Sequence, residues 1–345
     1  MPLRILVVDD TRFYRNLVIK VLGALPGIEI TGTAADGQEA LDRIEVQNPD
    51  LVILDLEMPV LSGLDVLDAL RRKRSPAGVV MFSSVTTRGA QLTLKALEGG
   101  AFDFVPKPEG GDPTENLAFM TRELETAVRA FEASRSPKAA PAVPPRQIPR
   151  PDVSGKPVDL VVVGVSTGGP QALAVLVQGF SRAPSVPVVV VQHMPATFTT
   201  SLAQTLASKV RFPVKEAADG EPLLAGTLYI APGGRQTAVV RTVGRLHLAV
   251  NDDPPVNFCK PAVDYLFRSA ASAVVGGLTA VVLTGLGNDG TEGCRFLRDR
   301  GARVLVQDEA SCVVASMPRS VVQAGLADGV VALDKMAEAI EGTLK

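Results

Sequence analysis

Val158-Asp-Leu-Val-Val-Val-Gly-Val-Ser-Thr-Gly-Gly-Pro170 joins an apolar, β-branched run of strand length to a glycine-rich turn and a proline. Proline suits the first turn of a helix, where its missing N–H is not needed, so the stretch predicts a buried strand that turns sharply into a helix. Ser166 lies on that turn, beside helix N-terminal amides that could form an oxyanion hole. The spacing Gly164-x-Ser166-x-Gly168 fits a nucleophile elbow. A glycine-rich turn after a strand is, however, also typical of a phosphate or dinucleotide cradle.

The composition indicates a globular chain of two or three domains. Hydrophobic residues make up 46% of the 345 residues. No apolar run reaches the roughly 18 residues needed to span a bilayer, and the N-terminus is too short and too acidic for a signal peptide. We therefore predict a cytoplasmic protein without membrane insertion. The three cysteines have no C-x-x-C spacing, so neither a disulfide nor a zinc site is predicted.

Charge divides the chain into three parts. Residues 1–133 hold 14 basic and 20 acidic residues, residues 134–157 hold 5 and 1, and residues 158–345 hold 16 and 16. Only the short middle part is basic, which argues against a nucleic-acid partner and against a transcriptional output domain. The middle part is also rich in proline, which predicts an extended linker. An alternative is that its positive charge contacts the acidic N-terminal part.

Strand-like and helix-like segments alternate in residues 1–133, which predicts a doubly wound parallel sheet of five strands. Ligands of such sheets bind at the carboxyl ends of the strands. Asp9, Asp10 and Asp55 fall at those ends, where a hard cation would relieve their repulsion and one carboxylate could accept a phosphoryl group. Ser83 and Lys107 fall there too, and could hold the phosphate oxygens. Strands are expected at 4–10, 29–34, 51–55, 78–83 and 102–105, and helices at 12–25, 37–46, 63–73, 88–98 and 114–129.

These residues, with Met58-Pro59, Gly63 and Pro108, resemble the motifs of response-regulator receiver domains. The resemblance implies that a histidine kinase is the phosphoryl donor for Asp55. It also implies a cis Lys107–Pro108 bond and a switch residue, Phe104, that works by packing because it lacks a hydroxyl. The implied Mg²⁺ ligands are Asp9, Asp10, Asp55 and the Glu57 carbonyl, and the implied phosphoryl-sensing residues are Ser83, Lys107 and Phe104.

Residues 158–345 predict a second, mainly parallel α/β domain with one β-hairpin at 235–250. Strands are expected at 158–163, 186–192, 214–216, 227–230, 237–241, 246–250, 278–284 and 303–307, and helices after residues 169, 197, 261, 290 and 318 and at 332–344. Ser166, His193 and Asp289 each follow a buried strand, so they could meet at one edge as nucleophile, base and orienting carboxylate. Taken singly, His193 could be a loop histidine and Asp289 a helix N-cap. His247 alternates with apolar residues in the hairpin and is interpreted as structural.

The order Ser, His, Asp differs from the α/β-hydrolase order Ser, Asp, His. This half instead resembles the catalytic domain of the chemotaxis protein-glutamate methylesterase family. The resemblance rests on the three site motifs and on Tyr229-Ile-Ala-Pro-Gly, Asp253-Pro-Pro-Val-Asn and Pro261-x-Val-Asp-x-Leu-Phe-x-Ser269. It implies hydrolysis of glutamyl γ-methyl esters on methyl-accepting chemoreceptors, deamidation of receptor glutamines, and no cofactor in the catalytic domain. It further implies that a chemotaxis histidine kinase phosphorylates Asp55 and thereby uncovers the crevice at Ser166.

The oxyanion would be held by backbone N–H groups near Thr167 and Leu286. Leu286 stands where the family usually has methionine, and Phe258-Cys259-Lys260 stands where it usually has a His-Arg pair. Leucine at position 286 still supplies a backbone N–H for the oxyanion. The family's histidine, by contrast, has no counterpart at residues 258–260, so any polar role that it plays in the family is in doubt for this chain. The alternative interpretation of the chain is a phosphorylation-controlled adaptor that binds a nucleotide on residues 164–169 without hydrolase activity. It leaves His193 and Asp289 unexplained.

Overall fold

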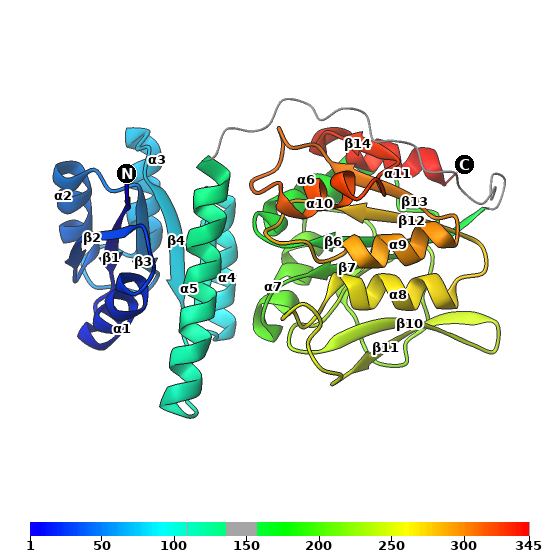
Figure 1. The fold of residues 1–345 in the computed structure, drawn as a ribbon, viewed down its shortest axis with the longest axis horizontal. Helices are drawn as coiled ribbons and strands as arrows, with labels where there is room; N and C mark the ends of the chain where they lie inside the picture. Colours follow the sequence, from blue (N-terminus) through cyan, green and yellow to red (C-terminus); the bar gives the residue numbers. More distant parts are fainter. Residues whose placement is uncertain (109, 136–156, 345) are drawn as a thin grey trace. The chain divides into compact units, whose positions relative to one another are not determined.

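A computed structural model describes residues 1–108, 110–135 and 157–344. The chain divides into two compact units, Met1–Ser136 and Pro137–Lys345 (Figure 1). Most of the predicted linker, 134–157, lies outside the described residues, and the last helix of the first unit ends at Arg135. Each unit is described below by itself.

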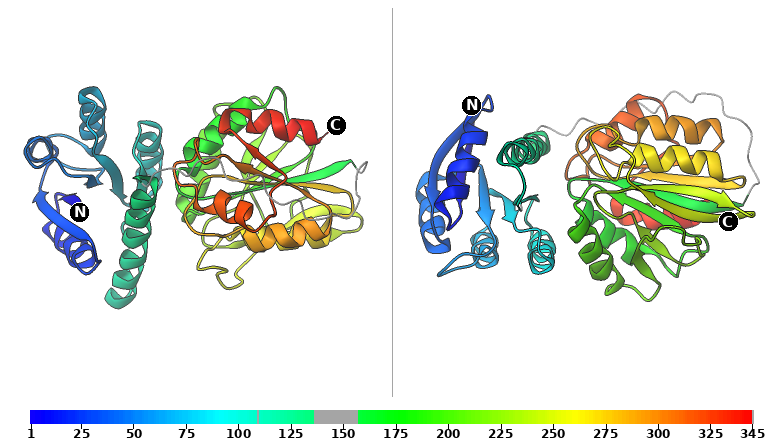
Figure 2. Two further views of the ribbon diagram at one scale, coloured as in Figure 1. Left: turned by 45° about the horizontal axis from the view of Figure 1, so that its top comes forward. Right: turned by 90° about the horizontal axis from the view of Figure 1, so that it is seen from below.

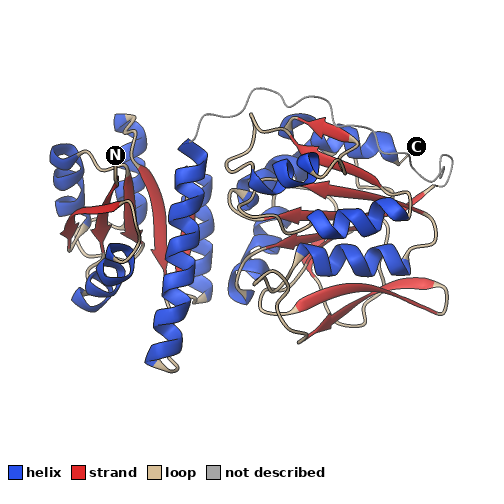
Figure 3. Cartoon of the chain, viewed as in Figure 1, coloured by secondary structure: helices blue, strands red, loops and turns tan. Residues whose placement is uncertain are grey.

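The N-terminal unit is a five-stranded parallel sheet, as predicted, and its strands lie in the order β2-β1-β3-β4-β5. Helices cover both of its faces (Figure 3). Alternate residues of β1, such as Ile5 and Val7, pack with residues of α1 and α5 such as Val18 and Leu124 to form a buried core. The strands are β1 Leu3–Val8, β2 Ile28–Ala34, β3 Leu51–Asp55, β4 Gly78–Ser83 and β5 Asp103–Pro106, and the helices are α1 Arg12–Gly23, α2 Gly37–Gln47, α3 Gly63–Lys73, α4 Thr87–Glu98 and α5 Pro113–Arg135.

The C-terminal unit contains a seven-stranded sheet in the order β14-β13-β12-β6-β7-β9-β8, in which every neighbouring pair is parallel. The predicted mainly parallel α/β domain with a hairpin is confirmed. Strand β14 was not predicted, because its three residues become a strand only through their pairing with β13. The strands are β6 Val158–Val165, β7 Val188–Gln192, β8 Val214–Glu216, β9 Leu228–Ile230, β12 Gly277–Val282, β13 Arg303–Gln307 and β14 Gly329–Val331.

Helices lie on both faces of this sheet, with α8 and α9 on one face and α6, α7 and α11 on the other (Figure 2). Strands β10 and β11 form a separate antiparallel hairpin, and the Val239 N–H on β10 donates to Ser269 Oγ on α8 at 2.9 Å. The remaining elements are α6 Gly169–Gly179, α7 Ala196–Ala207, β10 Gln236–Thr242, β11 Arg245–Asn251, α8 Val263–Ala273, α9 Thr291–Asp299, α10 Ser316–Gln323, a 3-10 turn Leu333–Lys335 and α11 Met336–Thr343.

Strand β6 lies in the middle of this sheet, between β12 and β7. Its residues from Leu160 to Val165 are all buried, as expected for a parallel strand that is covered on both faces. This places the turn at Ser166 between the ends of its two neighbouring strands. No helix in the described part of the chain is both long enough and apolar enough to cross a bilayer.

Candidate active site

Three adjacent strands of the second sheet end at one place. Val165 on β6 is in register with Gln192 on β7, so Ser166 and His193 follow paired residues. The backbone also joins the loops: the Ser166 N–H donates to the Thr284 carbonyl at 3.0 Å, and the His193 N–H donates to the Val165 carbonyl at 3.2 Å. The structure therefore brings the three predicted loops to a single edge of the sheet.

The Ser166 turn is tightly constrained. Gly168 has a φ of 76°, and a Cβ atom there would lie 2.6 Å from Cβ of Val313. The buried Gln192 side chain adds a constraint that sequence reasoning missed. Its Nε2 donates to the Ser166 carbonyl at 3.0 Å and to the His193 carbonyl at 3.2 Å. One amide thus ties together the backbones of the candidate nucleophile and the candidate base.

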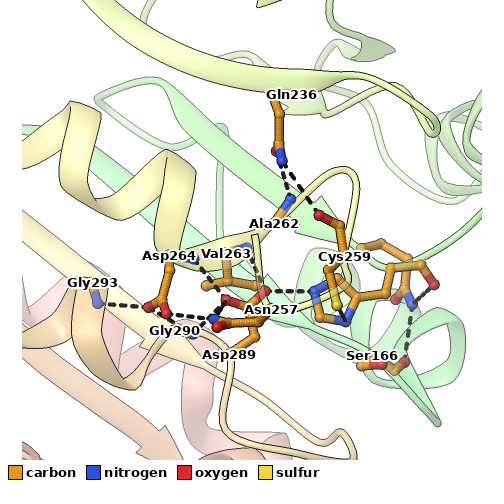
Figure 4. Close-up of polar contacts among 12 residues, drawn as sticks. Ser166, Gln236, Asn257, Cys259, Ala262, Val263, Asp264, Asp289, Gly290 and Gly293 are labelled. Carbon is orange, nitrogen blue, oxygen red and sulfur yellow. Dashed lines mark hydrogen bonds and ion pairs between the residues drawn. The ribbon is translucent and has the colours of Figure 1, made fainter. Parts of the chain in front are cut away.

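His193 lies between two side chains, one on each ring nitrogen. Nε2 is 2.8 Å from Oδ2 of Asp289, and Nδ1 is 3.7 Å from Sγ of Cys259. Figure 4 shows Cys259 and Asp289 on the two sides of the imidazole ring, and Ser166 nearby. In the described part of the chain, no hydrogen bond joins the Ser166 hydroxyl to His193. The structure therefore brings the base and the carboxylate together directly, and the nucleophile only to the same edge.

Asp289 is buried, with 4% of its surface exposed, and both of its oxygens accept hydrogen bonds. Oδ2 accepts from the Val263 N–H at 2.7 Å in addition to His193, while Oδ1 accepts from the Asp264 N–H at 3.0 Å and from Nδ2 of Asn257 at 3.1 Å. Burial raises the pKa of this carboxyl. The hydrogen bond and charge of His193, together with the backbone donors, outweigh burial and lower the pKa overall.

A second buried carboxylate, Asp264, lies beside Asp289. Oδ1 of Asp264 accepts from the N–H groups of Gly290 at 3.0 Å and Gly293 at 2.6 Å, at the start of α9. Asp264 therefore performs much of the helix-capping role that the sequence had left open for Asp289. Burial raises the pKa of Asp264, and the nearby charge of Asp289 raises it further, against its hydrogen bonds.

Asn257 bridges the two carboxylates. Its Nδ2 donates to Oδ2 of Asp264 at 2.8 Å as well as to Oδ1 of Asp289. Asn257 and Asp264 both lie in motifs that carried the family resemblance, but the local pattern gave no sign of their function. Only the fold shows that residues 257, 264 and 289 meet.

The charge of His193 is strongly affected by its surroundings. Burial lowers the pKa of the imidazole, but Cys259 and Asp289 outweigh burial and raise the pKa to about 10. The protonated imidazole is therefore stabilised in the resting structure. The other histidine, His247, lies on β11 of the hairpin, where its Nδ1 contacts the Arg245 carbonyl at 3.2 Å.

The two predicted oxyanion donors lie in the loops that surround Ser166. Thr167 is buried and Leu286 is half-buried, and among the described residues no acceptor binds the backbone N–H of either. Gly285, which precedes Leu286, approaches Ser166 so closely that a Cβ there would lie 2.7 Å from Cβ of Ser166. The glycine therefore lets the two loops meet.

The receiver residues gather at the carboxyl edge of the first sheet. Nζ of Lys107 lies 2.8 Å from both Oδ2 of Asp9 and Oδ1 of Asp55. Carboxylate oxygens of Asp9, Asp10 and Asp55 all lie within 4.8 Å of one another. Burial raises the pKa of Asp55 to about 6, with Lys107 opposing and Asp9 adding to the shift. Such an arrangement of oxygen ligands suits Mg²⁺.

The remaining receiver residues lie at or near the ends of β3, β4 and β5. The Ser83 hydroxyl accepts a hydrogen bond from Oγ1 of Thr93 at 2.7 Å, while Phe104 is half-buried and Glu57 is exposed. The prediction of a cis Lys107–Pro108 bond was wrong, since the only cis bond among the described residues is Lys260–Pro261. An X–Pro bond prefers trans by only about 0.5–1 kcal/mol, so tertiary surroundings decide the isomer and the sequence does not display them.

The fold and the site define a class of protein: a receiver-type unit followed by an α/β unit that carries a Ser, a His and an Asp at its strand ends. Residues 161–340 match the CheB methylesterase family and residues 5–117 match the response regulator receiver domain. The chain belongs to the CheB methylesterase family. Nothing found supports the alternative of a nucleotide-binding adaptor.

Relatives match along nearly the whole chain. A protein-glutamate methylesterase/protein-glutamine glutaminase of Desulfotalea psychrophila is 44% identical over 99% of this chain and 99% of that protein. One from Geobacillus kaustophilus is 41% identical over 98% of this chain and 97% of that protein. The crystal structure of the CheB methylesterase catalytic domain of Thermotoga maritima is 38% identical, with a TM-score of 0.52 over 54% of this chain and 98% of that one.

Proposed function

We infer that this chain hydrolyses glutamyl γ-methyl esters on methyl-accepting chemoreceptors and deamidates receptor glutamines by the same attack. The observation that carries this proposal is the contact of 2.8 Å between His193 and the buried Asp289, at the sheet edge that also holds Ser166. The names of the relatives support the substrate class.

In the proposed reaction, Oγ of Ser166 attacks the ester carbonyl and Nδ1 of His193 takes its proton. Asp289 holds the proton on Nε2 and stabilises the imidazolium that forms. The N–H groups of Thr167 and Leu286, which have no acceptor among the described residues, would donate to the oxyanion. Methanol leaves with the proton from His193. Water then attacks the acyl-enzyme, and glutamate is released as Ser166 regains its proton.

Regulation is proposed to act through Asp55. A histidine kinase of the chemotaxis system would supply the phosphoryl group, and Asp9, Asp10, Asp55 and the Glu57 carbonyl would hold Mg²⁺, which neutralises charge during transfer. Lys107 is already positioned against both Asp9 and Asp55. Ser83 and Phe104 would respond to the new phosphoryl group, and a cytoplasmic location accords with a kinase donor.

Methanol release from methylated receptor membranes tests the proposal. The wild type should release methanol, and Ser166→Ala should release none above background. Ser208→Ala, an exposed serine at the end of α7, is the matched control and should behave as the wild type. Equal release by Ser166→Ala would exclude Ser166 as the nucleophile, and no release by phosphorylated wild type would remove the proposed function.

A further inference from the structure

The contact between Cys259 and His193 joins two groups that bind soft metal ions. Sγ of Cys259 lies 3.7 Å from Nδ1 of His193 although the residues are 66 positions apart. With a metal–sulfur bond of about 2.3 Å, a metal–nitrogen bond of about 2.0 Å and a tetrahedral angle, two ligand atoms lie about 3.5 Å apart. The observed separation therefore nearly matches that of two ligands on one tetrahedral ion.

The histidine is prepared for such an ion. Its other nitrogen, Nε2, contacts Oδ2 of Asp289 at 2.8 Å. A metal-binding histidine nearly always donates its second N–H to a carboxylate or carbonyl, because this contact fixes the tautomer and leaves a basic lone pair on the ligating nitrogen. Asp289 gives His193 this arrangement: it holds the proton on Nε2, so that Nδ1, the nitrogen that contacts Cys259, is the one that binds an ion once it loses its own proton.

The cysteine is held in place by its own loop. The backbones of Val256 and Cys259 exchange two hydrogen bonds, of 3.1 and 2.9 Å, around Asn257 and Phe258. Both central residues have positive φ angles, 52° and 62°, as a tight two-residue hairpin turn of type I′ requires. Nε2 of the fully buried Gln236 also donates to the Cys259 carbonyl at 3.3 Å. Figure 4 shows Gln236 and its hydrogen bond to the Cys259 carbonyl.

The site is also accessible to solvent ions. Cys259 is half-exposed, whereas Cys294 and Cys312 are buried, and 15% of the His193 side chain is exposed. Two protein ligands leave two positions of a tetrahedral ion for water. Binding would therefore be weaker than at a structural site with four protein ligands, and reversible by a chelator.

We propose that Cys259 and His193 form an inhibitory site for a thiophilic divalent cation such as Zn²⁺, with Asp289 supporting the histidine. As the two metal bonds form, the proton on Sγ of Cys259 and the proton on Nδ1 of the imidazolium are given to solvent, and His193 keeps its proton on Nε2. This inference rests on the proposed function, because Nδ1 is the atom that must accept the proton of Ser166. A metal on Nδ1 therefore stops the reaction.

The test uses the full chain with excess Mg²⁺, so that the acidic cluster of the receiver is occupied. Added Zn²⁺ should abolish most methanol release, and a chelator should restore it. Added Co²⁺ should give a sulfur-to-cobalt charge-transfer absorption that oxygen ligands cannot produce. Both effects should be lost in Cys259→Ala, each variant being compared with its own metal-free state. His247→Gln, which changes the only other histidine, should keep both.

Two results would overturn the inference: no charge-transfer band in the wild type, or the same band and the same Zn²⁺ inhibition in Cys259→Ala. The two proposals can fail separately. Methanol release without any Zn²⁺ effect would leave the methylesterase and remove the metal site. A cobalt band that depends on Cys259, in a chain that never releases methanol, would leave the metal site and remove the methylesterase.

Discussion

Nε2 of His193 lies 2.8 Å from Oδ2 of Asp289, and this contact determines which ring nitrogen can act as a base. An ionised carboxylate only accepts hydrogen bonds, so the proton of a neutral imidazole lies on Nε2 and the lone pair on Nδ1. The low pKa of Asp289 keeps the carboxylate ionised even though it is buried. The chemistry of the site therefore depends on a tautomer that Asp289 selects.

Asp289→Asn should remove this selection. The asparagine amide can donate to Nε2, which favours the tautomer with its proton on Nδ1 and leaves no base for Ser166. We expect a fall in kcat of roughly 10³–10⁴-fold with KM little changed, as measured by methanol release. Asp299→Asn, an exposed acid at the end of α9, is the control. A fall of less than tenfold in Asp289→Asn would contradict this role.

Asn257 should be a positioning residue for Asp289. Asn257→Leu leaves two buried carboxylates without the donor that bridges them, which should cost about 1–3 kcal/mol in the free energy of unfolding and lower kcat. Asn257→Gly is the informative partner, because glycine adopts the φ of 52° without strain. If the amide matters, both variants lose activity. Full activity in Asn257→Gly would mean that only the backbone conformation is needed.

The sheet edge of the active site could be predicted from the sequence, because Ser166 and His193 directly follow buried strands and Asp289 lies in the loop after a third, β12. A strand end is a local feature that apolar runs and glycines reveal. The contacts between Cys259 and His193 and between Asn257 and Asp264 could not be predicted in this way. They depend on how the loop of residues 252–262 packs across the sheet edge, and no local period encodes that packing.

In the first unit, too, the residues at strand ends could be predicted from the sequence, whereas contacts between separate elements could not. The positions of Asp9, Asp55 and Lys107 follow from the alternation of strands and helices, and the structure places their charged groups in contact. The hydrogen bond between Ser83 and Thr93 joins a strand end to a helix and was not predicted. Strand β14 was missed because its pairing with β13, rather than its composition, makes it a strand.

Cys259 should control the pH dependence of the reaction. A base must be deprotonated to act, so a pKa of about 10 for His193 means that activity falls as pH drops through that range. In the metal-free enzyme, kcat/KM should therefore still rise with pH above neutrality. Cys259→Ser removes one of the two groups that raise this pKa, so the rising limb should move to lower pH. An unchanged profile, after subtracting the Ser166→Ala background, would contradict the prediction.

Asp55→Asn should abolish activation without abolishing catalysis. In the wild type, a small phosphoryl donor with Mg²⁺ should raise the rate of methanol release, and removing Mg²⁺ should prevent the rise. Asp55→Asn should keep the basal rate and show no response, because an amide cannot accept the phosphoryl group. The exposed Asp68→Asn serves as the matched control and should respond as the wild type. Activation that persists in Asp55→Asn would place the phosphoryl group elsewhere.

Removing the receiver should reveal how strongly it restrains the catalytic unit. The Thermotoga maritima catalytic domain was solved by itself, and 98% of it aligns with this chain, which supports the use of residues 158–345 alone. If the unphosphorylated receiver covers the Ser166 crevice, the isolated unit should be faster than the full chain and should ignore phosphoryl donors.

The rate of methanol release by the isolated catalytic unit, divided by that of the unphosphorylated full chain, measures how strongly the receiver inhibits the catalytic unit. When only a small fraction of the full chain is open, the rate of the isolated unit exceeds that of the full chain by the inverse of that fraction. A tenfold difference thus corresponds to a closed state favoured by about 1.3 kcal/mol. Phosphorylation can raise the rate of the full chain only to that of the isolated unit. A phosphorylated chain that exceeds the isolated unit would therefore require the receiver to assist catalysis, and equal rates without phosphorylation would exclude occlusion.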